Sequence, residues 1–274
     1  MELLSNSKPV YFNTGLAQLP ALMANGGYSK VFVLTDEHTS VHCLPVFQQL
    51  LDDFTGFDLI ETSAGEENKS IDFCIGIWKT LLDFGADRKC LLINLGGGVI
   101  TDMGGFIAAT YKRGVDFVNI PTSLLAQVDA SVGGKTGIDV DNAKNMVGTF
   151  SIPIAVFIED VFLKTLPEKE MRSGSAEVLK HGLIADAAYF KELNDTGLHA
   201  ITAAQVYRSV EIKNTVVTED PLEKGLRKIL NFGHTIGHAL ESYSLSNDKT
   251  PLTHGDAIAI GMICESYLSF KINN

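Results

Sequence analysis

Three histidines lie close together near the end of the chain, in the segments NFGHTIGHALE at 231–241 and THGD at 253–256. Imidazole nitrogens are frequent metal ligands in proteins. A single histidine is more often satisfied by an ordinary hydrogen bond, but this grouping together with other polar residues favours a shared site. A metal-centred active site is therefore the first hypothesis. The HExxH pattern of a metalloprotease helix is missing from the sequence.

Helical spacing gathers the polar residues of this region if residues 224–243 form one helix. Gly233 and Gly237 would each cost such a helix about 1 kcal/mol relative to alanine, which suggests that another segment approaches it closely. The opposite face is apolar. Steps of four and three residues place the following side chains on one face: Arg227, Asn231, His234, His238 and Glu241.

A carboxylate that could complete a metal site occurs earlier, in RSGSAEVLKHG at 172–182. Glu177 and Lys180 lie three residues apart on one helical face, as an ordinary surface ion pair also would. Together with His234 and His254, however, Glu177 would give Zn²⁺ one carboxylate and two imidazoles. That set leaves positions open for a substrate, which is typical of a catalytic site.

A glycine-rich segment, GGGVITDMGGF, directly follows the apolar run CLLINL. Glycines between a strand and a helix let backbone amides approach a pyrophosphate, although a plain tight turn has the same composition. Thr101 stands where the dinucleotide fingerprint has its third glycine. Asp36, at the end of an earlier strand, is suited to a ribose diol and favours NAD over its phosphorylated relative.

The segment DASVGGKTGID at 129–139 ends like a P-loop, but Asp129 occupies the position of the required first glycine, so the Walker pattern fails. Its Lys135, with Lys144 and Arg113, could form a small anion pocket in an otherwise acidic protein. Each of these cations alone could equally be a solvated surface residue.

The order of apolar segments predicts an α/β protein with a parallel sheet covered on both faces. A helix is expected at 71–84, closed by Gly85. Helical periodicity dominates from Pro167, so we expect a domain boundary near 165, between an α/β domain (1–165) and an all-helical domain (166–274). The β-branched, strand-like runs are 31–36, 58–62, 90–96, 116–121 and 154–159.

Composition narrows the functional class. The 274 residues carry a net charge of -11, which argues against a nucleic-acid surface. Four scattered cysteines without a CxxC pair indicate reduced thiols. With no apolar run of membrane-spanning length and no signal-peptide pattern, a cytoplasmic protein is expected. An amphipathic helix at 255–271 has no partner for its apolar face, so a further piece of chain is expected.

With these residues in view, the sequence resembles the 3-dehydroquinate synthase family over nearly its whole length. The resemblance implies a Rossmann-like NAD-binding domain followed by a helical metal- and substrate-binding domain, in a homodimer. Its most specific pieces are GGGVITDMGGFIAATYKRG, IPTSLLAQVDASVGGKTGID, KNMVGTF, RSGSAEVLKHG, NFGHTIGHALE and HGD.

The resemblance also implies residue roles. The metal ligands would be Glu177, His234 and His254, with His238 relaying protons, a distinction that spacing alone does not make. Substrate contacts would come from Asp129, Lys135, Lys144, Asn145, Lys180, Lys213, Arg227 and Asn231, with Arg113 reaching in from the partner subunit. The cofactor positions would be Asp36, Glu66, Lys69, Gly97, Gly98, Asp102, Thr122, Ser123, Lys135, Lys144, Thr165 and Leu166.

The implied activity is a phosphate-eliminating lyase of the shikimate pathway. It converts DAHP into 3-dehydroquinate and phosphate through transient oxidation by NAD, phosphate elimination, re-reduction and aldol cyclisation. Zn²⁺ is the expected metal, and Co²⁺ would fit the same ligands. The chain departs from the family at Asp256, usually Glu, and at His181, usually Tyr, and family members run beyond its length. Alternatives are another sugar phosphate cyclase, a metal-dependent polyol dehydrogenase, or a silent NAD- or metal-binding regulator.

Overall fold

The chain divides into two compact units, Met1–Thr165 and Leu166–Asn274. The computed structural model describes residues 1–140, 143–198 and 201–273. The α/β class with a helical second part is confirmed. Each unit contains its own set of candidate site residues.

A seven-stranded sheet forms the first unit, in the order β1-β2-β9-β6-β5-β3-β4. Every neighbouring pair is parallel except β1 and β2. All five runs expected to be strands are strands of this sheet. The strands are β1 (Glu2–Ser5), β2 (Lys8–Phe12), β3 (Val31–Asp36), β4 (Asp58–Thr62), β5 (Leu91–Gly96), β6 (Asp116–Pro121) and β9 (Ala155–Ile158).

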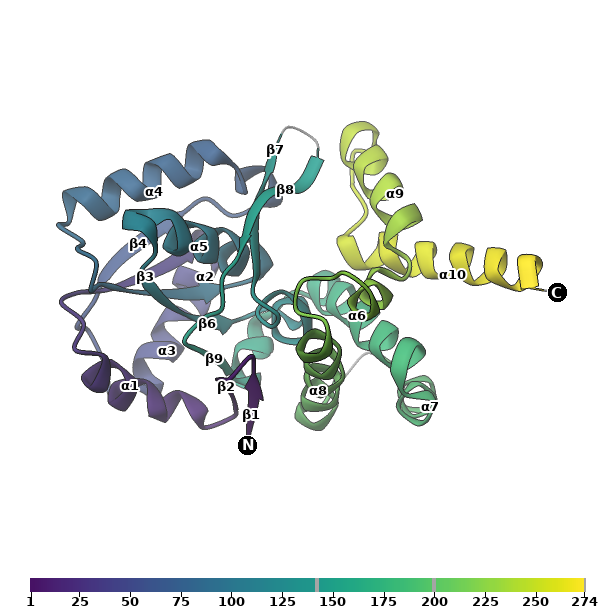
Figure 1. The fold of residues 1–274 in the computed structure, drawn as a ribbon, viewed down its shortest axis with the longest axis horizontal. Helices are drawn as coiled ribbons and strands as arrows, with labels where there is room; N and C mark the ends of the chain where they lie inside the picture. Colours follow the sequence, from purple (N-terminus) through teal and green to yellow (C-terminus); the bar gives the residue numbers. More distant parts are fainter. Residues whose placement is uncertain (141–142, 199–200, 274) are drawn as a thin grey trace. The chain divides into compact units, whose positions relative to one another are not determined.

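Helices cover both faces of this sheet, with α4 on one side of the strands and α1 on the other (Figure 1). Side chains alternate between two cores along each strand, so Val33 packs in one cluster and its neighbours Phe32 and Leu34 pack in the other. The expected helix at 71–84 is α4, and Gly85 follows it with a φ of 71°. The helices are α1 (Leu19–Gly26), α2 (Glu37–His42), α3 (Leu44–Leu50), α4 (Ile71–Asp83) and α5 (Gly98–Thr110), with short turns η1 (Gly15–Gln18), η2 (Glu66–Asn68), η3 (Tyr111–Arg113) and η5 (Asp160–Thr165).

The strand order reverses between β3 and β5. From β3 the chain adds β4 on one side, and then returns to add β5 on the other side. In parallel sheets such a switch point opens a crevice at the carboxyl ends of the two strands, where ligands bind. Asp36 ends β3 and Gly97 follows β5, so both sequence-selected positions lie at this edge.

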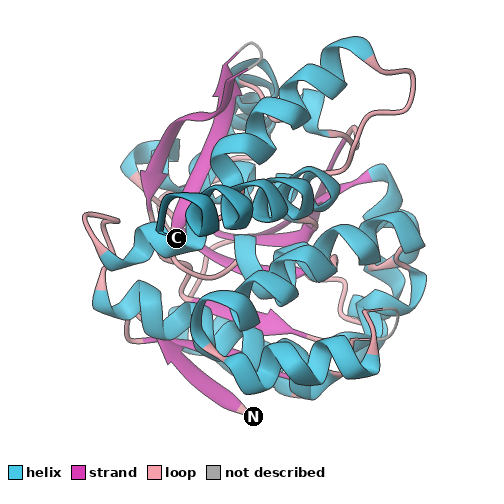
Figure 2. Ribbon diagram, turned by 90° about the vertical axis from the view of Figure 1, so that its right-hand side faces the viewer, coloured by secondary structure: helices cyan, strands magenta, loops and turns pink. Residues whose placement is uncertain are grey.

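A long hairpin of β7 (Lys135–Val140) and β8 (Ala143–Phe150) packs on α5, and Figure 2 shows its two strands side by side. The approach is close, because a Cβ added at Gly105 would lie 2.4 Å from Cγ2 of Thr136. A π-helical turn, η4 (Ala126–Ala130), precedes the hairpin and carries Asp129.

The second unit contains only helices and loops in residues 166–198 and 201–273. Among the described helices, none combines the length and apolar character that a membrane crossing requires. In the last helix, Ile263, Tyr267 and Phe270 are exposed and share one face. The elements are α6 (Glu168–Ala185), α7 (Ala187–Thr196), α8 (Ala203–Glu219), η6 (Leu226–Asn231), α9 (His234–Asn247) and α10 (His254–Asn273).

The prediction of one helix over 224–243 is wrong. The chain forms the 3-10 turn η6, becomes extended at Phe232 (ψ 128°) and adopts a φ of 82° at Gly233 before α9 begins. The break lets the chain pass closely over α10, since a Cβ at Gly233 would lie 2.6 Å from Cγ of Met262. Glu265 then caps α9 by accepting from the amides of Gly233 (2.8 Å) and Ile236 (3.3 Å).

Gly237 does lie inside α9, and the close approach that it predicted is present. A Cβ there would lie 3.1 Å from both the carbonyl oxygen of Ala257 and Cα of Ile258. The approaching segment is α10, which brings His254 to the histidines of α9.

Candidate functional site

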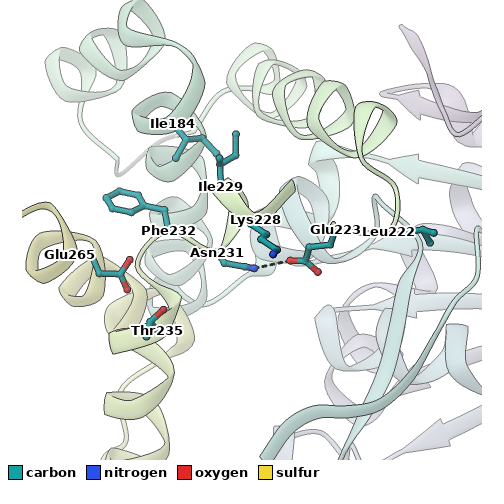
Figure 3. Close-up of a pocket in the computed structure, with 9 residues that line it drawn as sticks. All are labelled: Ile184, Leu222, Glu223, Lys228, Ile229, Asn231, Phe232, Thr235 and Glu265. Carbon is teal, nitrogen blue, oxygen red and sulfur yellow. Dashed lines mark hydrogen bonds between the residues drawn. The ribbon is translucent and has the colours of Figure 1, made fainter. Parts of the chain in front are cut away.

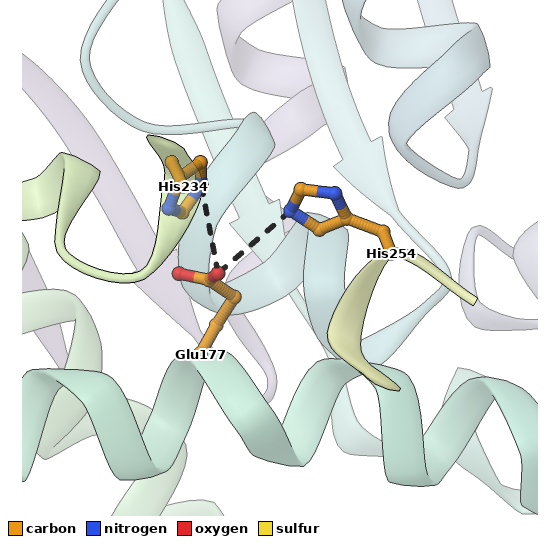
Figure 4. Close-up of side chains that lie close together, drawn as sticks. All are labelled: Glu177, His234 and His254. Carbon is orange, nitrogen blue, oxygen red and sulfur yellow. Dashed lines mark ion pairs between the residues drawn. The ribbon is translucent and has the colours of Figure 1, made fainter. Parts of the chain in front are cut away.

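Glu177, His234 and His254 converge within the second unit from three separate helices (Figure 4). Glu177 lies inside α6 and has no solvent exposure, whereas the histidines are the first residues of α9 and α10. Oε1 of Glu177 is 3.9 Å from Nε2 of His234 and 3.8 Å from Nε2 of His254. The potential ligand atoms of the three residues lie within 4.8 Å of one another.

These separations suit one shared cation. At 3.8 and 3.9 Å the nitrogens are too far from Oε1 for a direct hydrogen bond. A tetrahedral Zn²⁺ with bonds of about 2.0–2.1 Å places its ligands roughly 3.4 Å apart, so small side-chain movements would complete the site. One carboxylate and two imidazoles are also a donor set that Zn²⁺ or Co²⁺ accepts. The residues present therefore fit a divalent transition metal.

The two oxygens of Glu177 face different partners. Oε1 faces the two imidazoles, and Oε2 forms an ion pair with Lys180 on the next turn of α6. The Glu177–Lys180 pair, whose spacing would also suit a surface ion pair, is fully buried, at 1% and 0% side-chain exposure. Burial, and then the nearby Lys180 ammonium, lower the pKa of His234 to about 4. His234 is therefore neutral near pH 7, as a metal ligand must be.

A capping box places His254 at the first position of α10. The Thr253 hydroxyl accepts from the Asp256 amide (3.1 Å), and the Asp256 carboxylate accepts from the Thr253 amide (3.3 Å). Arg172 of α6 binds both Asp256 oxygens, at 3.0 and 3.1 Å. Asp256 therefore performs the capping task at this position, and ties the start of α10 to the helix that carries Glu177.

His238 lies one turn after His234 and completes a cluster of three imidazoles. Its ring centroid is 5.0 Å from that of His234 and 5.8 Å from that of His254. The grouping inferred from the sequence is thus present. His238 shares a second group of possible ligand atoms with Glu241 and His254, and His254 also belongs to the group with Glu177 and His234.

Three cations expected to hold the substrate are buried in the second unit: Lys180, Lys213 and Arg227. The Arg227 guanidinium donates to the carbonyl of Pro221 at 2.8 Å. Asn231 donates to Glu223 at 2.7 Å and lines a cavity of about 810 Å³. The described lining of this cavity, drawn in Figure 3, is Ile184, Leu222, Glu223, Lys228, Ile229, Asn231, Phe232, Thr235 and Glu265.

The glycine loop after β5 is shaped for close approach. A Cβ at Gly97 would lie 3.4 Å from Oγ of Ser123, and a Cβ at Gly96 would collide with Ile100 at 2.6 Å. Thr101, which replaces the fingerprint glycine, bonds through its hydroxyl to the carbonyls of Gly97 (3.3 Å) and Gly98 (3.1 Å). As at the start of any α-helix, the first amides of α5 have no carbonyl one turn earlier in the helix, and here they lie at the carboxyl edge of the sheet.

The carboxyl ends of two more strands, β3 and β6, carry expected cofactor positions. Asp36 caps α2 by accepting from the amides of His38 (3.0 Å) and Thr39 (2.8 Å) through one oxygen. Thr122 follows β6, and Thr165 ends the first unit. Both hydroxyls lower the pKa of the buried Cys43 thiol, a residue that sequence reasoning missed because an isolated cysteine carries no pattern. Burial raises the pKa of Cys43 to about 11, so it stays a neutral thiol.

Lys69 is the centre of a polar cluster in the first unit. Its ammonium donates to Asp102 and to Asn145, each at 2.7 Å, and Lys144 lies 3.2 Å from Glu66. Burial alone lowers the pKa of Lys69, but the Asp102 and Glu66 carboxylates outweigh it and the net pKa is raised. All five residues were selected from the sequence.

Asp139 joins this cluster and was missed. It accepts from the Asn145 amide at 2.7 Å, and its own amide donates to the carbonyl of Lys69 at 2.8 Å. Both contacts involve the main chain of a hairpin whose Asn145 has a φ of 54°. A single aspartate in a strand gives no sequence signal for such contacts.

The three cations proposed as one anion pocket are separated within the first unit. Lys135 begins β7, whereas Lys144 lies near the far end of the hairpin, roughly 13 Å away along the strands. Arg113 is exposed and precedes β6, at the amino edge of the sheet opposite the glycine loop.

Leu166, another expected cofactor position, is the first residue of the second unit.

Comparison with known proteins identifies similar sequences over most of the chain. The family profile described as 3-dehydroquinate synthase N-terminal matches residues 59–173, and the one described as 3-dehydroquinate synthase C-terminal matches residues 174–274. A 3-dehydroquinate synthase of Parabacteroides distasonis is 44% identical, with 98% of this chain and 77% of the relative covered. One of Acetivibrio thermocellus is 40% identical, with 96% and 74% covered.

A solved structure supports the fold. The 2-epi-5-epi-valiolone synthase of Streptomyces hygroscopicus, solved with NAD⁺ and Zn²⁺ bound, superposes with a TM-score of 0.82 at 29% identity. The superposition covers 95% of this chain and 74% of that one.

Proposed function

Because this chain belongs to the 3-dehydroquinate synthase family, we propose that it converts DAHP into 3-dehydroquinate and inorganic phosphate. The reaction would proceed by transient oxidation, phosphate elimination, re-reduction and aldol cyclisation, making the enzyme a carbon–oxygen lyase. The observation that carries the proposal is the convergence of Glu177, His234 and His254 on one point in the second unit.

Glu177, His234 and His254 would hold the divalent metal, with Zn²⁺ as the first choice and Co²⁺ as an alternative. When bound, the metal would polarise a substrate oxygen, and NAD⁺ would take up and later return a hydride. Neutral His234 offers a nitrogen lone pair near pH 7. His238, whose ring lies beside those of His234 and His254, would relay a proton.

The remaining polar residues would bind and orient. The buried cations Lys180, Lys213 and Arg227 would bind the anionic groups that a sugar acid phosphate carries. In the first unit, Asp36 and the amides after Gly97 lie at the switch point of the sheet, which supports an NAD site there. The other expected positions (Glu66, Lys69, Gly98, Asp102, Thr122, Ser123, Lys135, Lys144, Thr165 and Leu166 for NAD; Asp129, Asn145 and Asn231 for substrate) remain part of this proposal.

The exposed Arg113 fits the proposed homodimer, in which it would serve the partner's site. Its place at the amino edge of the sheet leaves it unable to join the glycine loop of its own unit. Replacing Arg113 by Ala should lower turnover, and mixing this variant with an inactive His234→Ala chain should restore part of it. A mixture without any gain would contradict a shared site.

Phosphate release from DAHP tests the activity directly. Turnover should require NAD⁺, should stop when a chelator removes the metal, and should resume with Zn²⁺. His234→Ala should abolish turnover and tight zinc binding together, whereas His42→Ala, an exposed histidine of the first unit, should change neither. An active His234→Ala protein at ordinary metal concentration would refute the assignment.

The same assay separates the alternatives. A polyol dehydrogenase would accumulate NADH with a polyol, whereas the proposed enzyme would release phosphate with no net NADH. Another sugar phosphate cyclase would prefer a neutral sugar phosphate to DAHP in a substrate panel. The relatives at 40 and 44% identity carry the 3-dehydroquinate synthase name, which favours DAHP over the substrate of the 29% identical 2-epi-5-epi-valiolone synthase.

A further inference from the structure

The two ring nitrogens of His254 face two different carboxylates. Nε2 lies 3.8 Å from Oε1 of Glu177, across the proposed metal position. Nδ1 lies 3.3 Å from Oε2 of Glu241, which is a hydrogen-bond distance. Glu241 projects from α9, is 3% exposed, and belongs to the polar set that the sequence spacing selected, yet the proposed reaction gives it no task.

A neutral imidazole carries one N–H, and an ionised carboxylate can only accept. The Glu241 carboxylate therefore favours the tautomer with its proton on Nδ1. That tautomer leaves the lone pair on Nε2, directed toward Glu177 and the metal position. The contact fixes both the protonation pattern and the rotation of the ring.

His234 has the same arrangement with a different acceptor. Its Nε2 faces Glu177, and its Nδ1 lies 3.3 Å from the main-chain carbonyl of Phe232. Both proposed metal-binding rings are thus held from behind by an oxygen acceptor, as is usual for metal-bound histidines. For His234 the acceptor belongs to the main chain, so for His254 alone it can be removed by substitution.

We propose that Glu241 is a positioning residue, which holds His254 in the tautomer and orientation that bind the metal of the proposed function. The inference rests on that metal site. The competing interpretation is a second cation held by His238, Glu241 and His254, whose ligand atoms also lie within 4.8 Å of one another. The 3.3 Å contact favours the hydrogen bond, because the pairs that face the proposed metal stand farther apart, at 3.8 and 3.9 Å.

Zinc affinity of the metal-free protein tests the proposal without reference to activity. In competition with a chromophoric chelator, Glu241→Ala should bind Zn²⁺ about 10–100-fold more weakly than the natural chain. Glu241→Gln, whose amide oxygen still accepts from Nδ1, should recover most of that loss. Glu219→Gln, at an exposed position of α8, is the matched control and should bind like the natural chain.

Stoichiometry separates the two interpretations. One Zn²⁺ per chain in both the natural protein and Glu241→Ala supports the positioning role, and excess Zn²⁺ should then restore turnover to Glu241→Ala but not to His254→Ala. Two ions per chain, falling to one in Glu241→Ala, would instead show that Glu241 is a ligand of a second metal site. Unchanged zinc affinity in Glu241→Ala would overturn it.

The tautomer provides a test that does not depend on a variant folding. In the ¹⁵N spectrum of metal-free, histidine-labelled natural protein, the His254 ring should carry its proton on Nδ1, with the assignment made from His254→Asn. A proton on Nε2 would overturn the proposal. A natural chain that neither binds Zn²⁺ nor releases phosphate from DAHP would instead refute the proposed function, so the two failures are distinguishable.

Discussion

The Lys69 cluster of the first unit and the Oε1 side of Glu177 in the second unit differ in how closely their polar groups meet, whereas Oε2 of Glu177 is paired directly with Lys180. In the first unit, the Lys69 ammonium touches Asp102 and Asn145 at 2.7 Å each. In the second unit, Oε1 of Glu177 stands 3.8 and 3.9 Å from two imidazole nitrogens. The first distance is that of a charge-assisted hydrogen bond, whereas the second leaves room for an ion between the groups.

This difference teaches how a cluster of polar residues can be interpreted. The Lys69 cluster pairs opposite charges directly, so removing one partner would leave the other charge buried without compensation and would lower stability. The Glu177 cluster combines one carboxylate with two imidazoles, of which His234 resists protonation. Its arrangement becomes most favourable when a cation binds, so its principal contribution is to function. Substitutions in the Lys69 cluster should therefore lower stability with little effect on zinc affinity. Substitutions in the Glu177 cluster should lower zinc affinity with little effect on the stability of the metal-free protein.

The largest effect is expected from His254→Ala in the second unit. Zinc affinity should fall more than about 100-fold, because a direct ligand contributes more than the 10–100-fold of an outer partner. Turnover of DAHP should be lost with it. Stability of the metal-free protein should change by less than about 1 kcal/mol, since the ring is partly exposed. Chelator competition measures the zinc affinity, and urea unfolding measures the stability. A stability loss without a change in zinc affinity would contradict the proposed difference between the two clusters.

The stability of the metal-free protein should fall as the pH drops from about 6.5 to 4. The unfolded chain takes up a proton on its histidines near pH 6.5, whereas folded His234 takes one up only near its pKa of about 4. This pKa difference corresponds to about 3 kcal/mol of stability, present above pH 6.5 and lost by pH 4. His234→Gln should flatten this part of the urea-measured profile, and an unchanged slope would show that His234 does not titrate in this way.

Asp102→Asn, in the Lys69 cluster of the first unit, should lower stability and leave zinc affinity almost unchanged. It removes the charge opposite buried Lys69, which costs about 2–3 kcal/mol after allowance for the partial exposure of Asp102. Zinc affinity should remain within about twofold of the natural value, because no proposed zinc ligand lies in this unit. Asp83→Asn, at an exposed position of α4, is the control. A parallel loss of zinc affinity would mean that the two clusters are coupled.

The smallest effect concerns the helix start that carries His254. Thr253→Ala removes half of the capping box of α10 and should cost about 1 kcal/mol of stability. Zinc affinity should fall only severalfold, since Asp256 still holds the first turn through Arg172. Thr253→Ser keeps the hydroxyl and should behave like the natural chain. A zinc defect as large as that of His254→Ala would show that the cap itself fixes the ligand.

Much of the fold followed from local patterns in the sequence. The β-branched runs and the helix closed by Gly85 depend on side-chain periodicity and on backbone freedom at one residue, and both are local properties. The prediction failed at 224–243, where polar spacing suggested one helix. There Gly233 turns the chain because α10 passes against it, and that contact is formed by residues distant in sequence.

The sequence by itself determined the residue types of the site: a carboxylate, a cluster of histidines and several basic residues, with the family that their motifs resemble. Only the tertiary structure decided which atoms meet, because His234 and His254 begin different helices and face Glu177 through packing of α10 against α6 and α9. It also decided that Glu241 faces the back of His254, that Asp139 bonds to Asn145 and Lys69, and that the Thr122 and Thr165 hydroxyls influence the Cys43 thiol. Such contacts depend on the three-dimensional approach of separate elements, for which linear spacing holds no information.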